Sequence, residues 1–136
     1  MEALQTDIDA GALPHYIFIT PNMCNNSHDC SLRTTDAWTK DLLDRLIPAL
    51  EKDGEKYLVV LNWDEGESKK TCCGLPEKAG GRIAVVLISP LVKHNFKDPT
   101  PYSHYSLLKT VSAAWDLPYL GHAADAETSL ILRPWK

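Results

Sequence analysis

Three short apolar runs, rich in β-branched residues, constrain the fold of this chain more than any other feature. They span residues 16–20, 57–63 and 83–88, and each ends in polar or turn-forming residues. Runs of this length between turn signals are typical of buried strands. The second run stops at Asp64 and Glu65, so we expect a strand that delivers two carboxylates to a sheet edge. Open α/β sheets bind ligands at the carboxyl ends of their strands, which makes this edge the candidate site.

The segment between the first two runs has the spacing of an amphipathic helix, 36–50. Thr35 suits its N-cap, Gly54 its end, and Pro48 should kink or shorten its last turn. Strand, helix and strand then form a βαβ unit, which predicts parallel strands and a right-handed crossover. The apolar positions of this helix are Trp38, Leu42, Leu43, Leu46, Ile47 and Leu50.

The rest of the chain contains one more expected helix. Residues 1–15 are polar and small, and 66–82 form a polar loop rich in Lys and Glu. A helix near 103–115 follows the third strand. Its expected buried face consists of Leu107, Leu108, Val111, Ala114 and Trp115.

Composition excludes several classes of protein. With 136 residues and 44% hydrophobic residues, the chain has the size of one globular domain. A net charge of −4 argues against nucleic-acid binding, which needs clustered Lys and Arg. No apolar run is long enough for a membrane helix, and residues 1–30 lack the order of a secretion signal.

The cysteines leave two interpretations open. Cys24 and Cys30 flank a short polar loop, so they either close it as a disulfide or remain two thiols. Cys72 and Cys73 are adjacent, which matches no common zinc motif. A thiol-based redox or metal protein is therefore a minor alternative.

Three groups of side chains can carry chemistry. Asp64 and Glu65 offer the oxygen ligands that hard divalent cations prefer, although such a pair alone is more often a solvated turn. The loop from Asn22 to Asp29 holds His28, which can ligate a metal or protonate a leaving oxygen, or can simply bond Asp29. His104 opens the last helix, where a surface or capping histidine is the ordinary alternative.

The order of these motifs resembles the phosphoesterase family, which contains acid phosphatases and bacterial phospholipases C and lies within the alkaline phosphatase superfamily. Fungal secreted acid phosphatases are most similar, because their first loop also bears cysteine. The resemblance covers about residues 5–122 and depends on ordered segments. These are Leu13-Pro14, residues 16–22, His28-Asp29, Trp38, Asp64-Glu65, Gly81-Arg82, Ser89-Pro90 and residues 104–110.

The resemblance implies a fold, a reaction and roles for matching residues. The fold is a three-layer α/β sandwich with a mostly parallel sheet flanked by helices. Asp64 and Glu65 correspond to ligands of a divalent metal ion, and Asn22 and His28 to residues that bind the phosphate ester. His28, Asp29 and His104 correspond to catalytic residues. The implied reaction is metal-dependent hydrolysis of phosphate esters by a secreted, acid phosphatase-like monoesterase.

One departure from the family limits that expectation. Family members are longer, and their amino-terminal part holds a Ser or Thr nucleophile and further metal ligands. Ser27, Ser31, Thr34 and Thr35 lie in a different context from that nucleophile. We therefore expect residues 1–136 to be a single partial domain, the carboxyl-terminal half, partnered by the missing amino-terminal half. The alternative is an inactive, truncated paralogue that acts as a binding or interaction module.

Overall fold

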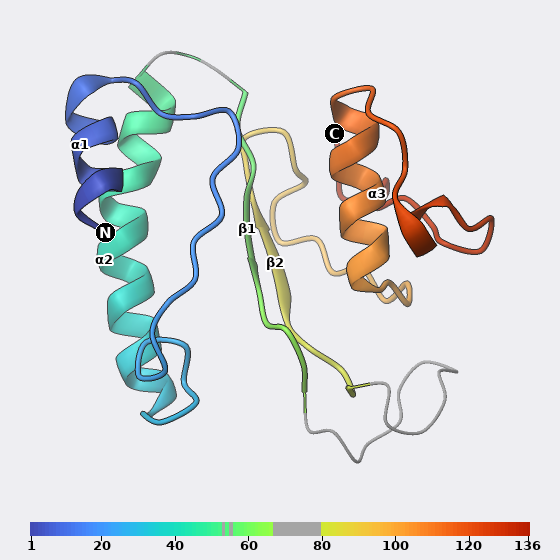
Figure 1. The fold of residues 1–136 in the computed structure, drawn as a ribbon, viewed down its shortest axis with the longest axis horizontal. Coiled ribbons are helices and arrows are strands. Elements are labelled where there is room, and N and C mark those ends of the chain that lie inside the picture. Colours follow the sequence, from blue (N-terminus) through green and yellow to red (C-terminus); the bar gives the residue numbers. More distant parts are fainter. Residues whose placement is uncertain (53, 55, 67–79) are drawn as a thin grey trace. The chain divides into compact units, whose positions relative to one another are not determined.

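The computed structural model describes residues 1–52, 54, 56–66 and 80–136, in two compact units, Met1–Glu55 and Lys56–Lys136. The described residues form helices α1, α2 and α3, the short 3₁₀ helix η1 and an antiparallel pair of strands, β1 and β2 (Figure 1). The chain is therefore an α/β protein, as expected. Within the described residues, no helix is both long and apolar enough to span a membrane.

The first unit begins with a helix that was not expected. Helix α1 spans Glu2–Ala10 and ends at Gly11, whose φ of 61° is the left-handed conformation that glycine adopts readily. The amide of Gly11 donates to Ile8 O at 3.1 Å, and that of Ala12 donates to Asp7 O at 2.9 Å. This pair of bonds is a Schellman motif, which satisfies carbonyls at the helix end. The helix was not predicted because residues 1–15 are mostly polar and small.

Helix α2 spans Leu32–Lys52 and confirms the second predicted element. It begins three residues before Thr35, because Ser31 rather than Thr35 caps it: Ser31 Oγ accepts the amide of Thr34 at 3.4 Å. Leu42 and Leu46 are buried at 7% and 5% exposure, on the predicted apolar face. Pro48 lies inside the helix without shortening it.

A side-chain hydrogen bond joins the two helices of this unit. The Arg45 guanidinium donates to Gln5 Oε1 at 2.7 Å and also to Asp41 Oδ2 at 2.9 Å. The carboxylate fixes the guanidinium on α2, which leaves its other nitrogen directed at α1.

The predicted strand at 16–20 is absent. Residues 16–20 have no strand assignment, and burial merely alternates along them: Ile17 and Ile19 are half-buried, while Phe18 is 80% exposed. A strand requires a hydrogen-bonded neighbouring strand, and the sheet formed by the described residues contains β1 and β2 but not residues 16–20. The expected βαβ unit is therefore not formed there, although the period-two burial that suggested a strand is present.

In the second unit, β1 (Val59–Asn62) pairs with β2 (Val85–Ile88), both shorter than predicted. The pairing is antiparallel, with Val59 opposite Ile88 and Asn62 opposite Val85. The expectation that these strands end at one edge is therefore wrong: Asp64 follows β1 where β2 begins, and Ser89 follows β2 at the other end. Antiparallel strands need no crossover helix, and the described residues between them contain none.

Helix α3 spans His104–Ala114, close to its predicted bounds, but its buried face is not the expected one. Ser106 and Ser112 are buried, whereas Leu108 and Trp115 are 38% and 48% exposed. Helix η1 (Gly121–Ala124) contacts α3 and contributes the fully buried Ala123. Leu107 and Val111 of the expected face are half-buried, so only part of the apolar stripe is covered and the rest remains in solvent.

Glycine at position 66 allows the two ends of the 66–80 segment to meet. The amide of Gly66 donates to Gly80 O at 2.6 Å. A Cβ at position 66 would lie 2.8 Å from Arg82 O and 3.1 Å from Gly80 O. Both contacts are with backbone atoms, so a side chain there would force the segments apart.

Gly66→Ala should therefore lower the free energy of unfolding by about 1–3 kcal/mol through overpacking. Amide hydrogen exchange at positions 65 and 66 should accelerate in this variant. The control is Gly121→Ala, where a Cβ meets nothing within 4 Å and only the positive φ of 49° opposes the substitution. Unchanged exchange at 65 and 66 in Gly66→Ala would show that the backbone approach is not required.

A charged cluster joins the segment before α3 to the carboxyl-terminal segment. Asp98 accepts hydrogen bonds from the amide of Thr100 at 3.0 Å, from Tyr102 OH at 3.1 Å and from Arg133 Nη1 at 2.9 Å. Burial by itself would raise the pKa of Asp98. The hydrogen bonds from Thr100 and Tyr102 and the charge of Arg133 outweigh burial and hold that pKa below 3.8.

This pKa depression predicts how stability varies with pH. Because the folded pKa lies below the unfolded one, the ionised Asp98 stabilises the fold above about pH 4 and loses that effect as pH falls through the folded pKa. Asp98→Asn should be less stable than the wild type at pH 7, and the difference should shrink below about pH 4. Urea unfolding across pH measures this, with Asp116→Asn as the exposed control. A difference that is constant with pH would contradict the assignment.

Candidate functional site

The carboxylate pair lies where the sequence placed it, just beyond the end of β1. Asp64 and Glu65 are both exposed, separated from the strand only by Trp63. The amide of Glu65 donates to Asp64 Oδ1 at 2.9 Å, so one oxygen of Asp64 is engaged by the turn. Among the described residues, neither the second oxygen of Asp64 nor the carboxylate of Glu65 has a hydrogen-bond partner.

His104 is brought against this pair. As the first residue of α3, it lies 2.6 Å from the backbone oxygen of Asp64 through Nε2. A carbonyl oxygen can only accept, so Nε2 carries the proton and Nδ1 is the open nitrogen of the neutral ring. At this helix start, the amide of Ser103 donates to Ser106 Oγ at 3.3 Å. His104 thus contacts the backbone of Asp64 within the second unit.

The first loop is organised by its own hydrogen bonds and by a disulfide between Cys24 and Cys30. The amide of Asn25 donates to Asn22 Oδ1 at 2.9 Å, and that of His28 donates to Asn26 Oδ1 at 2.9 Å. Of the two interpretations of these cysteines, the disulfide is the one observed.

His28 and Asp29 form an exposed pair on this loop. His28 Nδ1–H donates to Asp29 Oδ1 at 2.7 Å, because a carboxylate only accepts. The side chains are 67% and 62% exposed. This contact is the ordinary one that the sequence allowed for, and it leaves Nε2 of His28 facing away from Asp29.

The predicted residues thus fall into two groups. Asn22, His28 and Asp29 share a loop of the first unit, and Asp64, Glu65 and His104 lie together in the second. The structure describes the geometry inside each group.

The second group offers the oxygen ligands that a hard cation prefers, but it offers too few of them. Carboxylate oxygens suit Mg²⁺, Mn²⁺ or Ca²⁺, which take six or more ligands. Across residues 1–52, 54, 56–66 and 80–136, no group of three or more His, Cys, Asp or Glu side chains is placed to hold a metal ion. The described residues alone therefore do not complete a metal site.

Three of the hydroxyls considered as nucleophiles, those of Ser31, Thr34 and Thr35, lie at the start of α2. Ser31 Oγ and Thr34 Oγ1 are hydrogen-bonded to each other at 3.2 Å at the start of α2. Thr35 is buried at 7% exposure.

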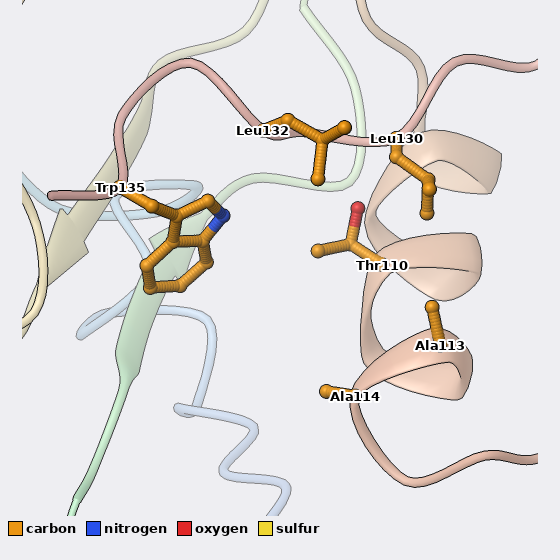
Figure 2. A pocket seen from close by; sticks show the side chains of 6 residues that line it. All are labelled: Thr110, Ala113, Ala114, Leu130, Leu132 and Trp135. Atoms are coloured by element: carbon orange, nitrogen blue, oxygen red, sulfur yellow. The ribbon is translucent and has the colours of Figure 1, made fainter.

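An apolar hollow on α3 is separate from these groups. Figure 2 shows Thr110, Ala113 and Ala114 of the helix opposite Leu130, Leu132 and Trp135 of the carboxyl-terminal segment. The hollow measures about 260 Å³ and has no titratable side chain in its lining. Its helical residues lie roughly 9–15 Å along the axis from His104, at 1.5 Å per residue. It offers packing surface rather than chemistry.

Sequence reasoning missed one pair of polar residues. His122 Nδ1–H, in η1, donates to Oδ2 of Asp125, the residue that follows η1, at 2.8 Å. The i, i+3 spacing of a histidine and an aspartate was the available signal. It indicates a contact only where the segment forms a helical turn, and that turn was not predicted.

The comparisons with known proteins match the chain to one family. Residues 1–118 match the Phosphoesterase family. A probable acid phosphatase of Kluyveromyces lactis is 41% identical over 128 residues, which is 92% of this chain and 28% of that protein. An acid phosphatase of Aspergillus niger is 34% identical over 120 residues, covering 85% of this chain and 26% of the relative.

A more distant relative comes from a bacterium. A phosphatidylinositol-3-phosphatase of Mycobacterium tuberculosis is 29% identical over 116 residues, 84% of this chain and 34% of that protein. The chain spans about a quarter of the length of the fungal relatives. No solved structure matches it. The family match covers most of the chain, so this chain belongs to the Phosphoesterase family.

Proposed function

We propose that this protein takes part in the hydrolysis of phosphate esters, as an acid phosphatase-like phosphomonoesterase. The observation that carries the proposal is the contact of His104 Nε2 with Asp64 O, 2.6 Å, in a chain that belongs to the Phosphoesterase family. It holds an imidazole beside two exposed carboxylates. An imidazole and carboxylates in one place are the groups that proton transfer and cation binding require.

Each predicted residue receives a role in this proposal. Asp64 and Glu65 contribute oxygen ligands to a divalent cation, whose other ligands come from outside the described residues. Bound there, such a cation would neutralise charge on the phosphoryl oxygens. His104 positions the carboxylate turn through Nε2 and offers Nδ1 toward the substrate. On the other unit, Asn22 and His28 bind the phosphate ester, and Asp29 orients the His28 ring.

We also propose that these residues form part of a larger three-layer sandwich. Val85 and Val86 are neighbours on β2, so they point to opposite faces of the strand, yet they are 47% and 46% exposed. A strand that is apolar on both faces is typical of a sheet covered on both sides. Relatives about four times as long provide enough chain for such layers.

The Cys24–Cys30 disulfide supports a proposed site of action outside reducing compartments. Disulfides persist in oxidising environments and are rare in the cytosol. A secreted protein, as implied by the fungal resemblance, fits this bond.

A second candidate function is an inactive binding module of the same family. It is favoured by the exposure of Asp64 and Glu65 and by the lack of a third ligand among the described residues. The two candidates differ in whether the carboxylate pair binds a cation.

Cation binding is therefore the direct test. Calorimetric titration with Mn²⁺ should show binding by the chain. The double variant Asp64→Asn/Glu65→Gln should weaken that binding at least about tenfold. Loss of a residue that merely orients a metal ligand already costs about that much affinity, and loss of the ligand itself should cost no less. The matched control removes the same charge elsewhere on the second unit, Asp116→Asn/Glu127→Gln, and should bind as the wild type does. Equal affinity in all three proteins would favour the inactive module.

A further inference from the structure

A triplet in the first loop, Asn25-Asn26-Ser27, matches the acceptor pattern for N-linked glycans, which is Asn-x-Ser with x other than proline. The sequence of residues 1–136 contains this pattern once. Because so short a pattern also arises by chance, the structure around the triplet decides whether it can carry a glycan.

One side chain of the triplet builds the loop and the other two do not. Asn26 Oδ1 accepts the amide of His28 at 2.9 Å, and Asn26 Nδ2 donates to Met23 Sδ at 3.8 Å. Among the described residues, the side-chain amide of Asn25 and the hydroxyl of Ser27 have no hydrogen-bond partner. Both residues are half-buried, so part of each side chain reaches solvent. The acceptor nitrogen and the hydroxyl that the pattern requires are therefore the groups that the loop leaves unused.

The backbone of the loop is held without these two groups. The disulfide between Cys24 and Cys30 closes the loop, and the amide of Asn25 donates to Asn22 Oδ1 at 2.9 Å at the surface. Ser27 has a φ of 71°, the left-handed conformation found in tight turns. Glycans are bulky and occupy surface positions of this kind. A sugar on Nδ2 of Asn25 would break neither the disulfide nor the bond to Asn22.

The disulfide is a second, independent observation that favours a glycan at this place. Disulfides form and persist in oxidising compartments, which include the secretory route. N-linked glycans are attached to surface loops of secreted proteins. The bond between Cys24 and Cys30 therefore indicates that the triplet passes through a compartment in which glycan transfer is possible.

We propose that Asn25 is an N-glycosylation site. The proposal rests on the proposed secretion of the protein and not on its hydrolytic activity. In the transfer step, Nδ2 of Asn25 loses a proton and forms a bond to C1 of the first sugar. The bond between C1 and the diphosphate of a lipid-linked oligosaccharide breaks, and the lipid diphosphate leaves.

The test is a peptide map of the protein as its own cells make it. An N-glycosidase releases the glycan and converts the acceptor asparagine to aspartate, so the peptide with residues 25–27 should then carry aspartate at position 25. Asn25→Gln should abolish this modification. Ser27→Gly should abolish it too, because glycine removes the hydroxyl yet suits the φ of 71°. In the control Asn26→Gln, the glycan should remain, because the pattern leaves the middle residue open.

The outcomes separate the site from the secretion on which it rests. Unmodified Asn25 in a protein with an intact Cys24–Cys30 disulfide would overturn the site alone, and so would a glycan that persists in Ser27→Gly. If Asn25→Gln does not fold, Ser27→Gly makes the same comparison. Free thiols at both cysteines would overturn the proposed secretion, and the site with it. Absence of ester hydrolysis by the glycosylated protein would overturn the hydrolytic function and support the site.

Discussion

The hydrogen bond between His104 Nε2 and Asp64 O is the contact on which the second unit's candidate site depends. It joins residues 40 positions apart, the end of β1 and the start of α3. The carboxylate turn is held to the helix start through this main-chain oxygen, and inside the turn Asp64 Oδ1 accepts the amide of Glu65. Gly66 serves the same turn from its other side, because only glycine lets the backbone approach Arg82. The site is thus arranged largely by contacts of the backbone.

Local sequence signals predicted an element well where the residues that define it lie within the element or directly beside it in the sequence. Helix α2 has a cap at Ser31 and an apolar face that includes Leu42 and Leu46, so helical spacing was sufficient. Strands β1 and β2 were found, but their antiparallel pairing was not, because a run of β-branched residues does not specify its neighbour. The failure at 16–20 has the same cause. Helix α1 was missed because no apolar periodicity marks it in the sequence. The Schellman motif that ends it is visible only in the backbone hydrogen bonds.

The candidate site shows a similar division. The sequence correctly placed Asp64 and Glu65 after a strand and His104 at a helix start, because turn and helix boundaries follow from residue type. It did not reveal that His104 bonds the backbone of Asp64 rather than a side chain. It also missed His122 and Asp125, whose meeting depends on a single 3₁₀ turn held by distant residues. Pairings made through tertiary contacts lie beyond what spacing along the chain can predict.

Exposure decides how strongly the carboxylate pair acts. Two unit charges 4 Å apart interact by about 1 kcal/mol in water and by about 4 kcal/mol at an effective dielectric of 20 near a protein surface. Asp64 and Glu65 are exposed, so they attract a cation with nearly the weaker energy. The apolar faces of β2 around Val85 and Val86 are the surfaces that a further layer would cover. Such a layer would also lower the dielectric around the turn beyond β1. The same layer would then cover the sheet and strengthen the proposed cation site. The affinity of Asp64 and Glu65 for a cation would therefore depend on the packing of residues that never touch it.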